Sequence, residues 1–144
     1  MRAAAAAIGR KIEVFAASTV REIDSAFAML VRKGCDALVV GSSSLFATRG
    51  VQLATLAALN RLPAMYYTRA SVEVGGLMSY GANIPDAVYQ GSIYVCRIFQ
   101  GEKPADLPII QSAKFEFVLN LQTARSFGLD VPPAMLAIAD EVIE

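Results

Sequence analysis

Hydroxyl-bearing residues follow three apolar runs of this sequence, and they are well placed to contact a ligand. Ser18 and Thr19 follow the run "IEVFAA", and a serine triplet, residues 42–44, follows "ALVVG". Thr68 closes the run "AMYYT" and precedes Arg69. Small hydroxyl side chains let a ligand approach closely and can both donate and accept hydrogen bonds. Serine and threonine also cap following helices, so ligand contact and capping both remain open.

Tyrosines and an arginine near these positions could add flat and charged contact surfaces. Tyr66, Tyr67 and Tyr80 lie near the expected strand ends and suit an aromatic or other flat ligand. Arg69 could hold a ligand carboxylate through its planar guanidinium. The alternatives are packing for the tyrosines and an exposed helix start for the arginine.

Side chains for catalysis are scarce. The chain has no histidine, which removes the commonest general base and metal ligand. Cys35 and Cys96 are isolated, without metal-binding spacing. We expect both to act as small buried hydrophobes, and a disulfide between them stays open. An enzyme on a flavodoxin-like sheet would need a glycine-rich nucleotide motif that is missing here. The sequence therefore predicts no catalytic residue, no metal and no cofactor.

The composition indicates one globular domain without an electrostatic footprint. Of 144 residues, 55% are apolar and 18% are charged, which is a folded and not a disordered composition. The 13 basic and 13 acidic residues cancel, so we expect no nucleic-acid partner. No apolar run approaches the about 18 residues of a membrane helix. The start "MRAAAAAIGRK" lacks a cleavage-like segment and is interpreted as a helix end without an export signal.

The elements that must position the candidate residues alternate between strand and helix. Residues 12–17, 37–41 and 64–68 are predicted strands. Thr19 and Glu22 form a capping box that opens one helix, and a second helix is expected over residues 48–60 with Val51 on its buried face. This alternation predicts an α/β parallel sheet, in which ligands bind outside the carboxyl ends of the strands.

After Thr68 the pattern changes. The stretch "GGLMSYG" predicts a short strand, and a helix should begin near Pro85 and end at Gly101. A strand over residues 114–120, a short helix over 120–128 and a final helix starting near Pro133 complete the prediction. The expected apolar face of the helix after Pro85 consists of Val88, Ile93, Val95, Ile98 and Phe99.

With these residues assembled, the chain resembles a known family over residues 4–144. The segments "ALVVGSSSLF", "GGLMSYG", "GEKPADLPI", "KFEFVLNLQTARSFGLDVPP" and "ADEVIE" occur in the order typical of ABC-transporter substrate-binding proteins. The resemblance is to the C-terminal part of the tryptophan/tyrosine-type periplasmic binding proteins. It implies a type I periplasmic-binding-protein-like fold of two α/β lobes that clamp an amino-acid-like ligand. The first lobe and the first strand of the second lobe are missing from this chain.

On that pattern, residues 1–74 are truncated second-lobe βα units. Residues 75–144 are a crossing strand, a helix that packs on the first lobe, and the C-terminal segment. The crossing strand would pass near the cleft, where its glycines allow close approach. The resemblance and the strand-end rule together predict the ligand-binding residues Ser42, Ser43, Ser44, Tyr67, Thr68, Arg69, Tyr80 and Gly81.

The implied function is the solute-binding component, or a truncated remnant, of an ABC importer for a small organic solute, with an amino acid as one candidate. An oligomeric fragment without transport function and a flavodoxin-like enzyme are the alternatives. Partners would be the solute, bound weakly or not at all by this chain, and the transporter's membrane subunits if a full-length form exists. The resemblance implies a periplasmic location, whereas the chain as written would stay cytoplasmic.

A second copy of the chain is a further expected partner. The missing first strand of the lobe would lie centrally in the sheet, so its loss leaves unpaired backbone groups. The helix after Pro85 would also lose the lobe on which it packs. We therefore expect a homodimer that exchanges the segment from Gly75 onward or pairs exposed strands.

Overall fold

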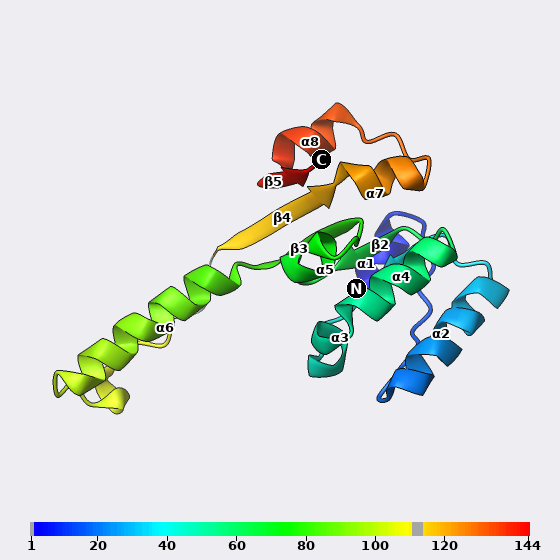
Figure 1. Ribbon diagram of the computed structural model, residues 1–144. Coiled ribbons are helices and arrows are strands. Elements are labelled where there is room, and N and C mark those ends of the chain that lie inside the picture. Colours follow the sequence, from blue (N-terminus) through cyan, green and yellow to red (C-terminus); the bar gives the residue numbers. More distant parts are fainter. Residues whose placement is uncertain (1, 111–113) are drawn as a thin grey trace. The chain divides into compact units, whose positions relative to one another are not determined.

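The computed structural model describes residues 2–110 and 114–144 (Figure 1). These residues form two compact units, Met1–Cys35 and Asp36–Glu144. The first unit holds only helices among its regular elements, and the second holds the sheet. The predicted division of the binding-protein lobe at residues 74 and 75 concerns a different boundary and stays a prediction.

The first unit consists of α1, Arg2–Ala7, and α2, Val20–Arg32. The capping box at the start of α2 is confirmed. The Thr19 hydroxyl accepts a hydrogen bond from the Glu22 amide at 3.3 Å, and the Glu22 carboxylate accepts one from the Ser18 amide at 2.6 Å. The first bond satisfies an amide that a helix start leaves without an intrahelical partner, and the second holds the amide of Ser18, one residue before the cap. Four apolar side chains along α2 are buried: Ile23, Ala26, Phe27 and Leu30.

The predicted strand over residues 12–17 is wrong for this structure. The segment joins α1 to α2 without strand pairing, and no backbone–backbone hydrogen bond connects it to any other described segment. A strand is defined by its ladder, so apolar and β-branched residues are not sufficient without a neighbouring strand.

The second unit is built on a five-stranded sheet in the order β1-β2-β3-β4-β5. The strands β1, β2 and β3 are parallel, β4 runs antiparallel to β3, and β5 is parallel to β4. The predicted α/β architecture with a mostly parallel sheet is confirmed. The last strand was not predicted, because "ADEVIE" was assigned to the final helix. The strands are β1 Leu38–Val39, β2 Ala64–Tyr66, β3 Met78–Ala82, β4 Phe115–Asn120 and β5 Glu141–Ile143.

Short helices connect the strands. The helix expected over residues 48–60 corresponds to α4, Gly50–Leu59, and a separate short helix that was not predicted, α3, Ser44–Thr48, precedes it. Val51 was predicted to be buried and is 62% exposed, because with 3.6 residues per turn it lies outside the face of α4 that the buried Leu53 and Ala57 share. The helix α5, Arg69–Glu73, lies against β3 and β4. The C-terminal part adds a 3₁₀ turn, Pro104–Asp106, then α7, Leu121–Ser126, and α8, Pro133–Ile138.

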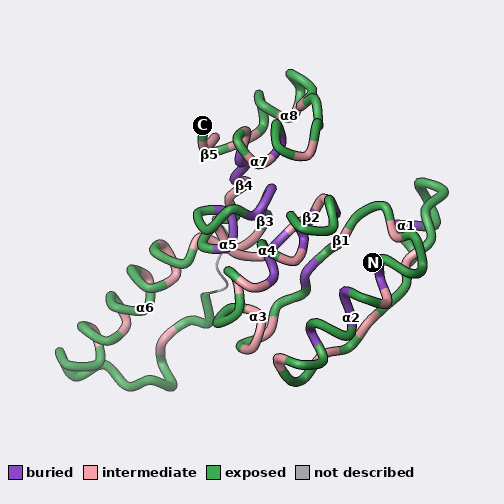
Figure 2. The backbone as a smooth tube through the Cα atoms, turned by 45° about the vertical axis from the view of Figure 1, so that its right-hand side comes forward, coloured by how far each residue is buried: buried purple, intermediate pink, exposed green. Residues whose placement is uncertain are grey.

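The longest helix, α6, spans Ile84–Phe99 and projects away from the sheet of its own unit (Figure 1). Asn83 caps it by accepting a hydrogen bond from the Asp86 amide at 2.8 Å. No α6 residue is buried (Figure 2). Cys96 is exposed, contrary to expectation, because it lies on this helix; Cys35 is half-buried, and both cysteines are free.

Candidate functional site

The loops that follow β1 and β2 meet at one edge of the sheet. The Tyr67 hydroxyl donates a hydrogen bond to the Ser43 carbonyl at 2.8 Å. Ser43 directly precedes α3, and its side chain makes no capping bond. This contact agrees with the rule that the carboxyl ends of parallel strands share an edge.

Gly81 of β3 lies against the loop that follows β2. A Cβ atom added to Gly81 would come within 2.0 Å of the Tyr67 carbonyl oxygen. Only glycine fits this approach, so the backbone of β3 passes the end of β2 without room for a side chain. The structure therefore brings together three of the predicted residues, Ser43, Tyr67 and Gly81.

Thr68 and the outer serines lie near this edge but make other contacts. The Thr68 hydroxyl lies 3.3 Å from the Ser71 hydroxyl, and it makes no capping bond to the α5 backbone. Ser71 is buried. Ser42 and Ser44 are exposed. Because Ser43 and Thr68 do not cap through their side chains, capping does not account for these hydroxyls.

Arg69 is held by carboxylates of the chain. Its guanidinium forms ion pairs with Glu73 at 2.8 Å and Glu141 at 2.7 Å, and lies 3.8 Å from Glu116. The hydrogen bond with Glu73, then that with Glu141, raises the pKa of Arg69. Glu116 also accepts a hydrogen bond from Asn83 at 2.9 Å, so this cluster joins α5, β4 and β5 to the start of α6. A ligand carboxylate at Arg69 would have to displace one of these partners.

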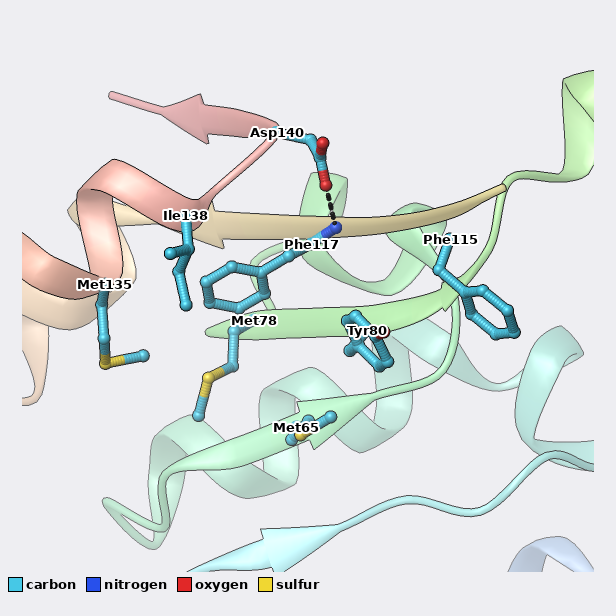
Figure 3. A pocket seen from close by; sticks show the side chains of 8 residues that line it. All are labelled: Met65, Met78, Tyr80, Phe115, Phe117, Met135, Ile138 and Asp140. Carbon is cyan, nitrogen blue, oxygen red and sulfur yellow. Dashed lines mark hydrogen bonds between the residues drawn. The ribbon is translucent and has the colours of Figure 1, made fainter. Parts of the chain in front are cut away.

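Tyr80 lies on an apolar groove of the sheet (Figure 3). Its ring stacks on Phe115 with 5.7 Å between centroids and an interplanar angle of 14°. The groove has a volume of about 540 Å³, within the range of small-molecule sites. Its one charged lining residue, Asp140, accepts a hydrogen bond from the Phe117 amide at 2.7 Å. The lining residues are Met65, Met78, Tyr80, Phe115, Phe117, Met135, Ile138 and Asp140.

Sequence reasoning identified only Tyr80 of this groove. The available signal was the alternation of side chains along a strand, which places Met78 with Tyr80, and Phe115 with Phe117. The contributions of Met135 and Ile138 depend on α8, whose position relative to the sheet is a tertiary feature that no local pattern indicates.

Tyr66 is a core residue and not a surface for a ligand. It is almost fully buried, and burial raises its pKa to about 12. A Cβ at Gly76 would lie 2.7 Å from its ring. Among the described residues, neither its hydroxyl nor that of Ser79 has a hydrogen-bond partner.

Among the described residues, no group of three or more cysteine, aspartate or glutamate side chains is placed to hold a metal ion. No helix within residues 2–110 and 114–144 has the length and apolar character needed to cross a bilayer.

A mostly parallel sheet with one antiparallel pair, β3 and β4, and with loops that meet at its edge is typical of a periplasmic-binding-protein-like fold. The sequence pattern of the family described as ABC transporter substrate binding protein matches residues 1–143, and the chain belongs to this family. It is a family of binding proteins and not of enzymes. No curated protein matches the chain.

Solved structures share the fold. One is the ABC domain in complex with L-Trp from Streptococcus pneumonia, with 27% identity and a TM-score of 0.87, covering 99% of this chain and 49% of its own. A conserved domain protein from Vibrio cholerae has 24% identity and a TM-score of 0.86 over 97% of this chain and 47% of its own. A ligand-free, open substrate-binding protein with adhesive properties from Clostridium difficile has 23% identity and a TM-score of 0.65, covering 98% and 47%. The chain thus spans about half the length of these relatives.

Proposed function

We propose that the chain is the second-lobe part of the solute-binding component of an ABC importer for a small organic solute. The observation that carries this proposal is the family match over residues 1–143. An amino acid is the favoured solute class, because the Streptococcus relative is in complex with L-Trp. The partners would be membrane subunits of the importer, and the site of action would be the periplasmic or extracellular side.

The ligand would bind at the edge where Ser43, Tyr67 and Gly81 meet. Ser42, Ser44 and Thr68 supply further hydroxyls there, and Arg69 supplies a cation that carboxylates already hold. Tyr80 offers a flat surface for a ring on the neighbouring groove. The contact between Tyr67 and Ser43 supports this assignment, because it fixes two strand-end loops at a shared edge before any ligand arrives.

The 144-residue chain by itself should bind its solute weakly. Small-molecule sites bury roughly 70–90% of a ligand's surface, and one lobe leaves a ligand face in water. The remaining contacts must still overcome the entropy cost of association. Calorimetric titration with L-tryptophan and other amino acids should therefore show no micromolar binding by this chain.

A two-lobed chimera tests the site itself. Joining the first lobe of the Streptococcus relative to this chain should restore binding of an amino acid. In that chimera Tyr80→Leu should weaken the affinity by about 2- to 10-fold, because an aromatic contact contributes about 0.5–1.5 kcal/mol beyond burial. Leu59→Ala, a change of an exposed residue at the end of α4, should leave affinity unchanged. Micromolar binding by the single lobe, or equal effects of both changes, would contradict the proposal.

Self-association is the second part of the proposal. A homodimer, with the segment from Gly75 onward exchanged or exposed strands paired, would cover apolar surface that the single chain leaves open. The exposed apolar residues of α6, among them Val88 and Phe99, favour it, since monomers rarely expose large contiguous apolar patches. The alternative function is an oligomeric fragment without transport function. The same exposed residues of α6 also support this alternative.

A further inference from the structure

The helix α6 leaves the sheet where β3 ends and β4 begins (Figure 1). At this point the backbone amide of Asn83 donates a hydrogen bond to the Lys114 carbonyl at 2.9 Å. No α6 residue is buried, so packing of its side chains within the described part of the chain does not fix the direction of the helix. The polar contacts at its first turn are the ones that can do so.

Asn83 uses both ends of its side-chain amide at this turn. The oxygen caps α6 by accepting a hydrogen bond from the Asp86 amide at 2.8 Å, and the nitrogen donates to the Glu116 carboxylate at 2.9 Å. The two bonds together fix which way the amide faces, because only its nitrogen can donate and only its oxygen can accept. The first turn of α6 is thereby tied to β4, the strand that carries Glu116.

Arg69 holds Glu116 from the start of α5. Each of its three guanidinium nitrogens faces a different carboxylate: Nε faces Glu73, Nη2 faces Glu141 and Nη1 faces Glu116. The first two contacts, at 2.8 and 2.7 Å, orient the planar group, and the third places a positive charge 3.8 Å from Glu116. The side chain of Glu116 is only 12% exposed, and a carboxylate shielded from water in this way needs such partners.

We propose that Asn83, Glu116 and Arg69 form a latch that sets the direction in which α6 leaves the sheet. Arg69 keeps the Glu116 carboxylate in place, Glu116 orients the Asn83 amide, and that amide caps the helix. Glu116 pairs with Gly81 across β3 and β4, so the latch lies next to the candidate binding edge. It goes beyond the proposed function, because it holds whether or not the chain binds a solute.

An exchange of donor and acceptor tests the latch in the 144-residue chain. Asn83→Asp retains an oxygen that can cap α6 but replaces the donating nitrogen, so that two carboxylates face each other. Glu116→Ala removes the acceptor and leaves the cap. Combining Asn83→Asp with Glu116→Gln restores the bond with donor and acceptor exchanged, and the net charge of the latch stays the same. Gln90→Glu makes the same change from amide to carboxylate elsewhere on α6 and is the matched control.

Pulsed electron paramagnetic resonance between two spin labels measures the direction of α6. Cys96 on this helix is exposed and carries one label. Gln122→Cys in α7 supplies the second position, and Cys35→Ala removes the other native thiol. The labelled chain is diluted with an excess of unlabelled chain, so that only distances within one chain are recorded.

The unchanged latch and the Gln90→Glu control should each give one narrow distribution of distances. Asn83→Asp and Glu116→Ala should broaden it or shift its maximum, and the double variant should restore it. Arg69→Gln should broaden it less than Asn83→Asp does, because Glu116 can still accept the bond from Asn83. Circular dichroism should show the same helix content for every variant, which excludes unfolding as the cause.

Three results would overturn the latch. The first is a distribution that is already broad in the unchanged chain. The second is a distribution that neither Asn83→Asp nor Glu116→Ala alters, and the third is a double variant that stays as broad as Asn83→Asp alone. An unaltered distribution in Arg69→Gln would exclude Arg69 from the latch and leave the direction of α6 to the bond between Asn83 and Glu116.

Discussion

The core around the sheet and the helix α6 both contain many apolar residues, but these residues differ in how far they are buried. Val72 of α5 and Val118 of β4 are fully buried, and Leu119 is nearly so. In α6 no residue is buried, and Phe99 is 87% exposed. The same unit thus contains a packed core and an apolar helix without a cover (Figure 2). Hydrophobic residues predict that a face will be buried, but the partner that buries it can lie outside the chain.

The largest expected difference comes from truncating one apolar side chain in each region. Leu119→Ala should reduce the free energy of unfolding by about 2–5 kcal/mol, because it removes buried contacts and leaves a cavity. Phe99→Ala removes a larger side chain, but its effect should stay within about 0.5 kcal/mol at concentrations where the chain is monomeric. Urea denaturation of both variants measures the contrast. Equal losses would mean that α6 is packed in solution.

Substituting one glycine in each region by alanine compares how tightly the backbone is packed in the sheet and in α6. Gly81→Ala should cost about 1–3 kcal/mol, because its new Cβ meets the Tyr67 carbonyl and forces a shift of β3. Gly91→Ala in α6 should instead stabilise by about 0.5–1 kcal/mol, because alanine favours a helix interior and nothing lies within 4 Å of its Cβ position. Opposite shifts of the urea midpoint are expected. A stabilising Gly81→Ala would contradict the tight approach at the candidate site.

The sequence was sufficient for local features and for the class of fold. The capping box at Thr19 and Glu22 depends on residues three apart, and it is present as predicted. The predicted strand over residues 12–17 is wrong. Whether a segment forms a strand depends on a neighbouring strand that is distant in the sequence, and the local pattern does not show that neighbour. Tertiary packing decides two further features. Arg69 binds Glu141, which lies 72 positions away in the sequence. Met135 and Ile138 line the groove. Short sequence patterns indicate which residues lie near a sheet edge. They do not show whether those residues already form bonds within the chain, as Arg69 does.

The smallest expected effect concerns the exposed ion pair at the end of α6. Arg97 donates two hydrogen bonds to Glu102, at 2.8 and 2.6 Å. This bonding, more than the attraction between the charges, lowers the pKa of the Glu102 carboxyl from its ordinary value of 4.5. A lowered folded-state pKa means that the pair stabilises the fold above the ordinary value and that this contribution is lost as pH falls through the lowered value. The contribution should be slight because solvent screens the pair.

Nuclear magnetic resonance titration of Glu102 should give a pKa below 4.5, and Arg97→Gln should return it to the ordinary range. A titration that Arg97→Gln leaves unchanged would show that the end of α6 is not held by this pair, and the helix would then lack the ion pair as well as buried contacts.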